Sequence, residues 1–233
     1  MSNKAKRLKV LHVIPSVAPC RGGPSKAIIE MVSALQDIGV DAEIATSNDN
    51  GDSELNIELN TLTNHQSVPI RFFKRCPYKL RSLREFSYSK PFKTWLTNHI
   101  QDYDLVHVHA IFSYFSSYAM LQARRNSIPY IIRPIGQLEE WSLNQSKLKK
   151  TLYLKLIEKA NIEGAGAVHF TADSERDQAL ARFKELNSCV IPLAVELPKQ
   201  ELAVTAQGAD YWQISEQNPV SYTHLTLPTI YSV

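Results

Sequence analysis

Cysteine is scarce in this sequence of 233 residues, and its three cysteines, Cys20, Cys76 and Cys189, are scattered. An odd number of cysteines without metal-ligand spacing is typical of a reducing compartment and argues against a disulfide framework. We therefore expect a cytoplasmic protein. Long apolar runs are also missing, because no segment approaches the ~18 consecutive apolar residues of a membrane-spanning helix. Any contact with the inner face of the cell membrane is therefore expected to be peripheral.

A large excess of charge of either sign is missing as well. The chain has 26 lysines and arginines against 23 aspartates and glutamates, a net charge of +3. A balance this close gives no support for nucleic-acid binding, and we expect no nucleic-acid partner. Hydrophobic residues make up 44% of the sequence, which is ample for a well-buried core.

The glycine fingerprints of dinucleotide and ATP sites are absent too. Gly22 and Gly23 follow the first apolar run, but no third glycine comes at the spacing that a dinucleotide site requires. NAD and ATP are therefore disfavoured. Paired glycines still allow a ligand to approach the backbone closely, and the helix that follows offers unpaired amides to an anion. A phosphate contact and an ordinary turn both fit this position.

Short β-rich runs alternate with stretches of helical spacing along most of the chain. The predicted strands cover residues 10–14, 42–46, 68–73, 105–109, 129–132, 167–170 and 189–191. The predicted helices cover residues 27–38, 91–100, 114–125, 148–162 and 173–184, and residues 48–66 are expected to form a long surface loop. This order predicts an α/β fold, a Rossmann-like doubly wound parallel sheet with helices on both faces. Such sheets bind ligands at the carboxyl ends of their strands.

Two histidines stand in the strand predicted over residues 105–109. Strand alternation puts His107 and His109 on the same side of the backbone, and His109 ends the strand. A histidine in this position can donate to a sugar hydroxyl or to a developing charge. The alternative is a pair of hydrogen-bonded core histidines. Two histidines without a nearby cysteine or carboxylate supply too few ligands for zinc, and we expect no metal.

Five segments in a fixed order give the sequence a family resemblance. They are Val10–Ser16, Gly22–Pro24, Tyr103–His109, Pro129–Trp141 and Val190–Val195. Together they resemble the retaining glycosyltransferases of family 4 over residues 8–198. The resemblance implies one half of the two-domain GT-B architecture, in which two Rossmann-like domains face each other across a cleft.

The same resemblance implies roles for individual residues. Gly22 and Gly23 match the loop that approaches the donor diphosphate, and His109 matches the active-site histidine beside the transferred sugar. Arg133 and Gly136 match a stretch that lines the cleft, although this arginine precedes the neighbouring proline, the reverse of the commoner family order. The co-substrate implied is a nucleoside-diphosphate-sugar. No metal cofactor is implied, since helix-terminal amides can stabilise the charge on the departing diphosphate.

A further match is the segment Thr171–Arg176, in which the resemblance places Glu175 at the cleft. The residues themselves also fit a helix cap, with Asp173 or Ser174 accepting hydrogen bonds from backbone amides. We favour the cap.

The resemblance also predicts how the chain is divided. Residues 8–198 are expected to form the amino-terminal, acceptor-side domain, residues 199–219 an irregular interdomain segment, and residues 220–233 a tail that resembles a translated sequencing adapter. An ordinary β-rich tail is the alternative. We expect the sequence to lack the donor-binding domain of the family, and we therefore expect the chain to be inactive alone.

The function implied is transfer of a sugar to a glycan or lipid-linked acceptor, in cell-surface or exopolysaccharide biosynthesis. The alternatives are a nucleotide-sugar epimerase of the same GT-B architecture and a stand-alone Rossmann-like module that binds a phosphorylated ligand. Residues 71–84 combine six cationic residues with aromatics and leucines. This stretch fits contact with an anionic membrane, and it also fits a solvated loop.

Overall fold

The computed structural model of the protein describes residues 6–76 and 86–193. These residues belong to one compact unit, Met1–Leu193, and the remaining residues, Ala194–Val233, form a second unit that is not described. The predicted interdomain segment, the adapter-like tail and the end of the matched segment Val190–Val195 therefore lie outside the described residues. Among the described residues, no helix is both long enough and apolar enough to cross a membrane.

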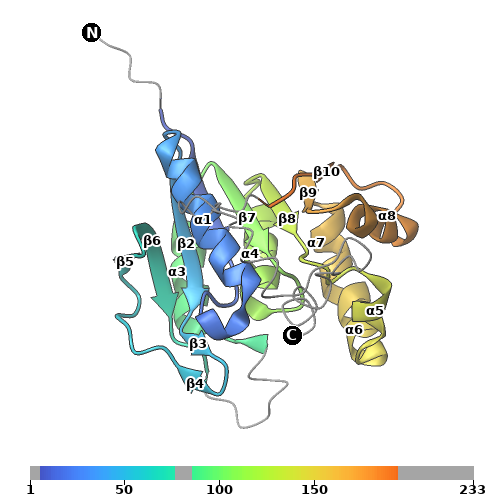
Figure 1. Cartoon of the computed structure of the whole chain (residues 1–233), viewed down its shortest axis with the longest axis horizontal. Helices are drawn as coiled ribbons and strands as arrows, with labels where there is room; N and C mark the ends of the chain where they lie inside the picture. The colour runs from blue at the N-terminus through green and yellow to red at the C-terminus, as the bar shows by residue number, and fades with distance from the viewer. Residues whose placement is uncertain (1–5, 77–85, 194–233) are drawn as a thin grey trace, which may run out of the picture. The chain divides into compact units, whose positions relative to one another are not determined.

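A mostly parallel sheet forms the centre of the described structure (Figure 1). Its strand order is β10-β9-β8-β7-β1-β2-β6-β5, and only β5 pairs antiparallel, with β6. The strands are β1 Lys9–Val13, β2 Asp41–Ser47, β5 Leu62–His65, β6 Val68–Phe73, β7 Leu105–His109, β8 Tyr130–Arg133, β9 Ala167–Phe170 and β10 Ser188–Val190. The predicted doubly wound α/β fold is confirmed.

Helices connect the parallel strands. They are α1 Gly23–Asp37, α3 Lys90–His99, α4 Tyr114–Arg125, α5 Glu140–Asn144, α6 Lys147–Tyr153, α7 Lys159–Glu163 and α8 Asp173–Arg182. The predicted helix over residues 148–162 is divided, because a π-helical turn, Leu154–Glu158, separates α6 from α7. The short helix α5 was not predicted from the sequence.

The prediction for residues 48–66 was wrong in part. This stretch contains a small hairpin, β3 Asp49–Asn50 with β4 Ser53–Glu54, and the edge strand β5. The strand predictions rest on apolar residues that alternate with polar ones. Strands β4 and β5 consist of exposed and half-buried residues, so they do not show this alternation. The sheet is consequently mixed at one edge.

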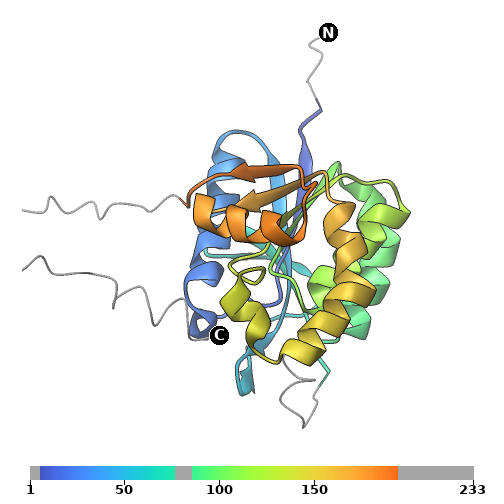
Figure 2. The same cartoon turned by 90° about the vertical axis from the view of Figure 1, so that its right-hand side faces the viewer.

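The two faces of the sheet carry separate hydrophobic clusters. Adjacent strand residues point to opposite faces, so Val10 packs in one cluster and Leu11 in the other. Helix α1 covers the first face through Ile28 and Val32. The helices α3, α4, α7 and α8 contribute to the second cluster. Figure 2 shows α1 (blue) on one side of the sheet and α3 and α4 (green) with α7 (gold) on the other.

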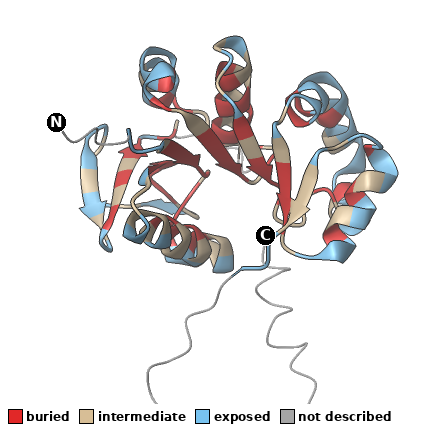
Figure 3. Ribbon diagram, turned by 90° about the horizontal axis from the view of Figure 1, so that it is seen from above, coloured by how far each residue is buried: buried red, intermediate tan, exposed pale blue. Residues whose placement is uncertain are grey.

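This distribution follows from right-handed crossovers. The chain passes from β6 through β7 and β8 to β10 in one direction across the sheet, whereas it passes from β1 to β2 in the other. Right-handed connections in opposite directions lie on opposite faces. In Figure 3 the strands are largely buried between helices whose outer surfaces are exposed.

Candidate functional site

Neighbouring parallel strands bring several polar side chains to the carboxyl-terminal edge of the sheet. In the observed register His12 of β1 lies opposite His107 of β7, and His109 lies opposite Arg133 of β8. Because residues that pair in register and residues two apart in a strand share a face, all four lie on the face that α1 covers elsewhere. We call His12, His107, His109 and Arg133 the histidine–arginine cluster.

The three histidine rings of this cluster contact one another. The His12 Nδ1 and His109 Nε2 atoms are 3.0 Å apart and form a hydrogen bond. The ring centroids of His107 and His109 are 4.2 Å apart, which confirms that the two side chains share one side of β7. His12 and His109 are completely buried. The burial agrees with the core-histidine alternative, whereas the catalytic role of His109 stays a prediction.

Burial keeps these rings neutral. Burial first and the charge of Arg133 second lower the pKa of His12 to about 3. Burial also holds the pKa values of His107 and His109 well below the usual range, with smaller contributions from the neighbouring histidines and Arg133. An uncharged imidazole can donate or accept a hydrogen bond according to its tautomer, so the cluster offers neutral polar groups to a ligand.

Arg133 is the charged member of the cluster, and its side chain is 1% exposed. Its Nε and one terminal nitrogen, Nη1, have no hydrogen-bond partner among the described residues. The outer ring nitrogens His12 Nε2 and His109 Nδ1 are buried and unpartnered in the same way. Buried N–H groups that lack acceptors cost free energy, so these two guanidinium nitrogens could hold an anionic ligand.

The loop after β8 is held by Glu175. One carboxylate oxygen accepts a hydrogen bond from the Gly136 amide at 2.7 Å, and the other accepts from the Thr171 amide at 3.0 Å. The favoured cap was therefore assigned to the wrong residues, because neither Asp173 nor Ser174 caps the helix. The longer Glu175 side chain reaches back over the first turn of α8, which the shorter side chains do not. Its negative charge also acts on Arg133.

The glycine turn after β1 has a backbone that requires glycine. Gly22 has φ 75° and ψ −143°, a conformation that essentially only glycine adopts, and Gly23 begins α1 directly after it. The first turn of α1 contains no acidic residue. No carboxylate of that turn offsets the positive end of the helix dipole, which favours an anion there.

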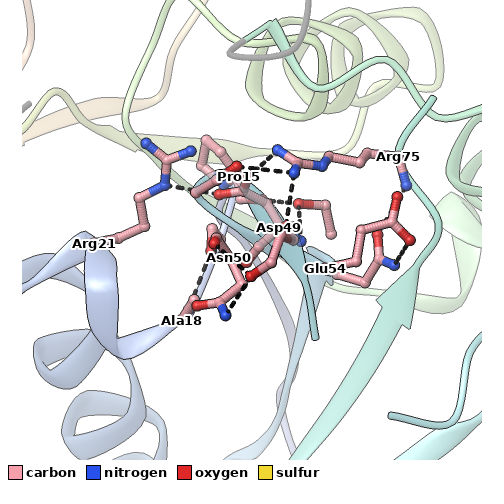
Figure 4. A network of polar contacts seen from close by, with 12 residues as sticks. Pro15, Ala18, Arg21, Asp49, Asn50, Glu54 and Arg75 are labelled. Atoms are coloured by element: carbon pink, nitrogen blue, oxygen red, sulfur yellow. Dashed lines mark hydrogen bonds and ion pairs between the residues drawn. The ribbon is translucent and has the colours of Figure 1, made fainter. Parts of the chain in front are cut away.

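A network of charged residues beside this turn was not found from the sequence (Figure 4). Asp49, at the start of β3, accepts a hydrogen bond from Arg21 Nε at 2.7 Å and forms an ion pair with Arg75. Arg75 also donates to the carbonyl oxygens of Gly51 and Ser53. This network ties the end of β6 and the hairpin to the residue that precedes Gly22. No local pattern signals it, since its members come from three separate segments.

Two arginines of the basic stretch 71–84 are held by contacts with the rest of the protein. Arg75 is 3% exposed and held by Asp49, so it does not face a membrane. Arg71 lies 5.0 Å from the centre of the Trp95 ring and donates to the Asn60 carbonyl. Arg75 therefore gives no support to lipid contact, and the two alternatives for the whole stretch stay open. Residues 77–84 lie outside the described part of the chain.

Non-glycine residues with positive φ occur in both loops that follow the central strands. Ala110 and Phe112, after β7, have φ of 67° and 58°, and Ile135, after β8, has φ of 57°. Each such residue costs on the order of 1–3 kcal/mol and persists only where its surroundings impose it. Here Gln137 accepts from the Ile111 amide and the buried Glu158 accepts from the Phe112 amide. Strain of this kind is typical of ligand-binding loops.

The histidines also form a possible metal-ligand group that the sequence did not reveal. One nitrogen from each of His12, His107 and His109 lies within 4.8 Å of the others, the single such group found within residues 6–76 and 86–193. The guanidinium of Arg133 acts on all three rings. Its positive charge opposes the binding of a second cation there, so the absence of a metal stays our prediction.

Two cavities in the described structure lie away from this edge. One, of about 480 Å³, lies between the α6–α7 region and residues 182–185. The other, of about 400 Å³, lies near the amino ends of β1 and β7 and is lined by Lys9 and Tyr103. Neither contains a member of the histidine–arginine cluster. The carboxyl edge is therefore identified by its chemistry and not by a cavity.

The chain belongs to the glycosyl transferase 4-like domain family, whose sequence profile matches residues 22–194. The matched region contains Gly22, Gly23, His109, Arg133, Gly136 and Glu175. A comparison with curated proteins found no match.

Solved structures place the fold among the Rossmann-like domains of GT-B enzymes. Sucrose-phosphate synthase from Thermosynechococcus elongatus superposes with a TM-score of 0.61 and 16% identity, over 91% of this chain and 54% of that protein. HepE from Anabaena, solved in complex with UDP, gives 0.52 and 16%, over 81% and 45%. A protein assigned as a UDP-N-acetylglucosamine 2-epimerase from Listeria monocytogenes gives 0.52 and 12%, over 80% and 45%. The chain thus spans 45% to 54% of these proteins, and the likeness concerns the fold.

The structure places the predicted residues in three pairs. His109 and Arg133 are paired in register, and Gly136 is bonded to Glu175. Gly22 and Gly23 lie after β1, the strand next to β7, and so at the same edge of the sheet. Sequence reasoning missed His12, whose polar side chain in an otherwise apolar strand was the one available signal.

Proposed function

We propose that this chain is the acceptor-side half of a glycosyltransferase that uses a nucleoside-diphosphate-sugar as donor. The reaction transfers the sugar to a hydroxyl of a glycan or lipid-linked acceptor, with retention of anomeric configuration, in cell-surface or exopolysaccharide biosynthesis. Family membership supports the transferase class. The UDP bound to HepE, whose structure shares this fold, supports the choice of donor.

The observation that carries the proposal is the buried guanidinium of Arg133 beside His109. Two of its nitrogens lack acceptors at the edge where parallel sheets bind their ligands. A diphosphate or the negative charge that develops on it during transfer would supply those acceptors. Arginine suits this task because it remains charged and presents several N–H groups to phosphate oxygens.

The other residues take complementary roles in this proposal. Gly22 and Gly23 let the diphosphate approach the first turn of α1, whose dipole favours negative charge. His109, neutral and fixed by His12, lies beside the transferred sugar. Since its ring is completely buried, this contact requires the strained 110–112 loop to shift when the donor binds. Glu175 positions the Gly136 loop.

The reaction as proposed needs no metal, because helix amides and Arg133 supply the positive potential. The donor-binding half of the enzyme is contributed by a second domain, so we expect the chain alone to transfer no sugar. We place the protein in the cytoplasm, at the inner face of the membrane when its acceptor is lipid-linked.

Calorimetric titration of the chain with UDP and with inorganic pyrophosphate tests the anion site. Loss of one charged hydrogen-bond donor costs about 1.5–3 kcal/mol, so Arg133→Gln is expected to weaken binding roughly 10-fold to 100-fold. Arg125→Gln, on the exposed end of α4, is the matched control and should bind as the wild type does. Equal affinity in the two variants, or no binding by the wild type, would overturn the proposal for Arg133.

Product analysis separates the alternatives. An epimerase of GT-B architecture would change the sugar of the nucleotide-sugar without an acceptor, whereas a transferase would release the nucleotide only when an acceptor is present. A stand-alone binding module would do neither. The fold likeness to the Listeria monocytogenes protein keeps the epimerase as the second candidate.

A further inference from the structure

The helical segment 147–157 is unusual in being both apolar and basic on its outer surface. Three leucines spaced four residues apart, Leu148, Leu152 and Leu156, are 87%, 59% and 69% exposed. Residues four apart in a helix lie on one face, so these side chains form a continuous apolar stripe. Ile157 at 42% and Trp141 of the neighbouring helix α5 at 50% add to the exposed apolar surface.

The stripe has no role in the core, because another face of the same segment already anchors it. Leu154 is buried in the hydrophobic cluster under α4. Glu158 is completely buried and accepts hydrogen bonds from Ser117 and Asn161. The inner side thus anchors the segment, whereas the three leucines leave most of their surface exposed. Exposed apolar surface of this extent normally marks an interaction site.

The charge of the segment indicates the partner. Residues 147–157 contain four lysines and no acidic residue. Lys150 is turned toward Ser142, whose carbonyl it contacts at 2.7 Å, but Lys147, Lys149 and Lys155 are exposed. Each exposed lysine adds to the attraction toward an anionic lipid surface, while the leucines provide the apolar face that enters it.

A groove beside the stripe has the same character. The cavity of about 480 Å³ is lined by Lys155, Lys159, Arg182 and Lys184, with Leu154 and Phe183 as apolar walls and Glu163 and Glu185 as its acids. Lys155 follows Leu152 by three residues, and Lys159 follows Leu156 by three, so the cationic wall borders the leucine stripe. An excess of two positive charges suits an anionic lipid headgroup next to the inserted leucines.

We propose that residues 147–157 are the surface by which this protein binds an anionic membrane. The helix lies in the plane of the interface, with the leucine stripe in the acyl boundary and the lysines at the headgroups. This assignment is separate from the basic stretch 71–84, in which Arg75 is buried in an ion pair. It does not depend on sugar transfer, since vesicle binding and the nucleotide titration are separate measurements.

Flotation with vesicles tests the proposal. The chain is mixed with vesicles of phosphatidylglycerol and phosphatidylcholine, or of phosphatidylcholine alone, and we expect it to float only with the anionic ones and to be released by added salt. Leu148→Gln, Leu152→Gln and Leu156→Gln combined should lower the partition coefficient at least about tenfold, because the apolar stripe is lost while glutamine preserves helix propensity. Lys147→Glu with Lys149→Glu should lower it by a similar factor.

The matched control changes three exposed apolar residues elsewhere. Leu8, Ile38 and Leu62 are 48%, 76% and 47% exposed, and the triple change of these to glutamine should leave flotation unchanged. Circular dichroism verifies that each variant is folded. Failure of the wild type to float, or equal loss in both triple variants, would overturn the proposal. Dimers in light scattering that the leucine variant alone abolishes, without an effect on flotation, would instead assign the stripe to a second copy of the chain.

Discussion

Two groups of buried polar residues at the carboxyl edge of the sheet are built in opposite ways. In the Asp49 network every part of the Asp49 carboxylate is used, since one oxygen binds Arg21 and the other Arg75. In the histidine–arginine cluster the charged member, Arg133, has two buried nitrogens without acceptors. Asp49 and Arg133 are both almost completely buried, but only Asp49 is joined to its charged neighbours by direct ion pairs. Glu175 acts on Arg133 through its charge alone, and Arg75 keeps one nitrogen, Nε, without a partner among the described residues.

We interpret this difference as that between a group that stabilises the fold and the anion site that we propose. A compensated network fixes the backbone near Gly22, whereas an uncompensated guanidinium costs stability that a bound anion would restore. Removing single members of the two groups should therefore change the free energy of unfolding by different amounts and, for one member, in the opposite direction.

The largest effect is expected from Asp49→Ala. The change leaves Arg75 buried without its carboxylate, so the free energy of unfolding should fall by about 3–5 kcal/mol. Urea denaturation followed by circular dichroism measures it. Asp37→Ala, at the exposed end of α1, is the control and should stay within about 0.5 kcal/mol of the wild type. A loss below about 1 kcal/mol for Asp49→Ala would show that the Asp49 carboxylate does not offset the cost of burying Arg75.

Glu175→Ala should have the next largest effect. The Gly136 and Thr171 amides lose their acceptor, and Arg133 loses the negative charge that acts on it, which together should cost about 2–3 kcal/mol. Asp173→Ala is the control, because Asp173 is 73% exposed and should contribute at most about 1 kcal/mol. Equal losses of stability in the two variants would instead support Asp173 as the residue that caps α8.

Acid should destabilise the protein through the histidine cluster. The pKa of buried His12 is about 3 in the folded protein, against 6.5 in the unfolded chain, so the unfolded chain binds more protons between these values. Stability is then complete above pH 6.5 and falls with decreasing pH, by up to about 1.4 kcal/mol per pH unit for each such histidine. Urea midpoints at pH 7, 6 and 5 should show this slope, and His12→Gln should reduce it. A flat profile would contradict the neutral cluster.

His107→Leu should have the smallest effect and the opposite sign. It removes a buried ring nitrogen, Nε2, that lacks a partner, so stability should be unchanged or rise by up to about 1 kcal/mol. Tyr103→Phe is the contrasting variant, because the Tyr103 hydroxyl donates to the buried Glu43 carboxylate. Its loss should cost about 1–3 kcal/mol. If both variants lose stability equally, the distinction between paired and unpaired groups fails.

The local pattern of the sequence predicted most of the fold. The apolar runs at 10–14 and 105–109 are strands in the structure, and the alternation that put His107 and His109 on one side is observed. The irregular pattern of residues 48–66 concealed the hairpin and β5, and the helical periodicity of 148–162 concealed the π-helical turn. The periodicity of apolar residues predicts which face of a strand or helix a residue lies on. It does not predict an edge strand or a helical turn whose residues depart from that period.

The sequence by itself determined the alternation of strands and helices, the parallel sheet and the edge at which the candidate site residues lie, because these follow from apolar spacing and right-handed connections. Tertiary structure alone decided which of those residues meet. His12 reaches His109 across 97 positions, Glu175 reaches Gly136 across 39, and Arg75 reaches Asp49 across 26. Such pairs depend on the order of strands in the sheet and on loop paths, which are set by the packing of the whole chain and not by any local pattern of residues.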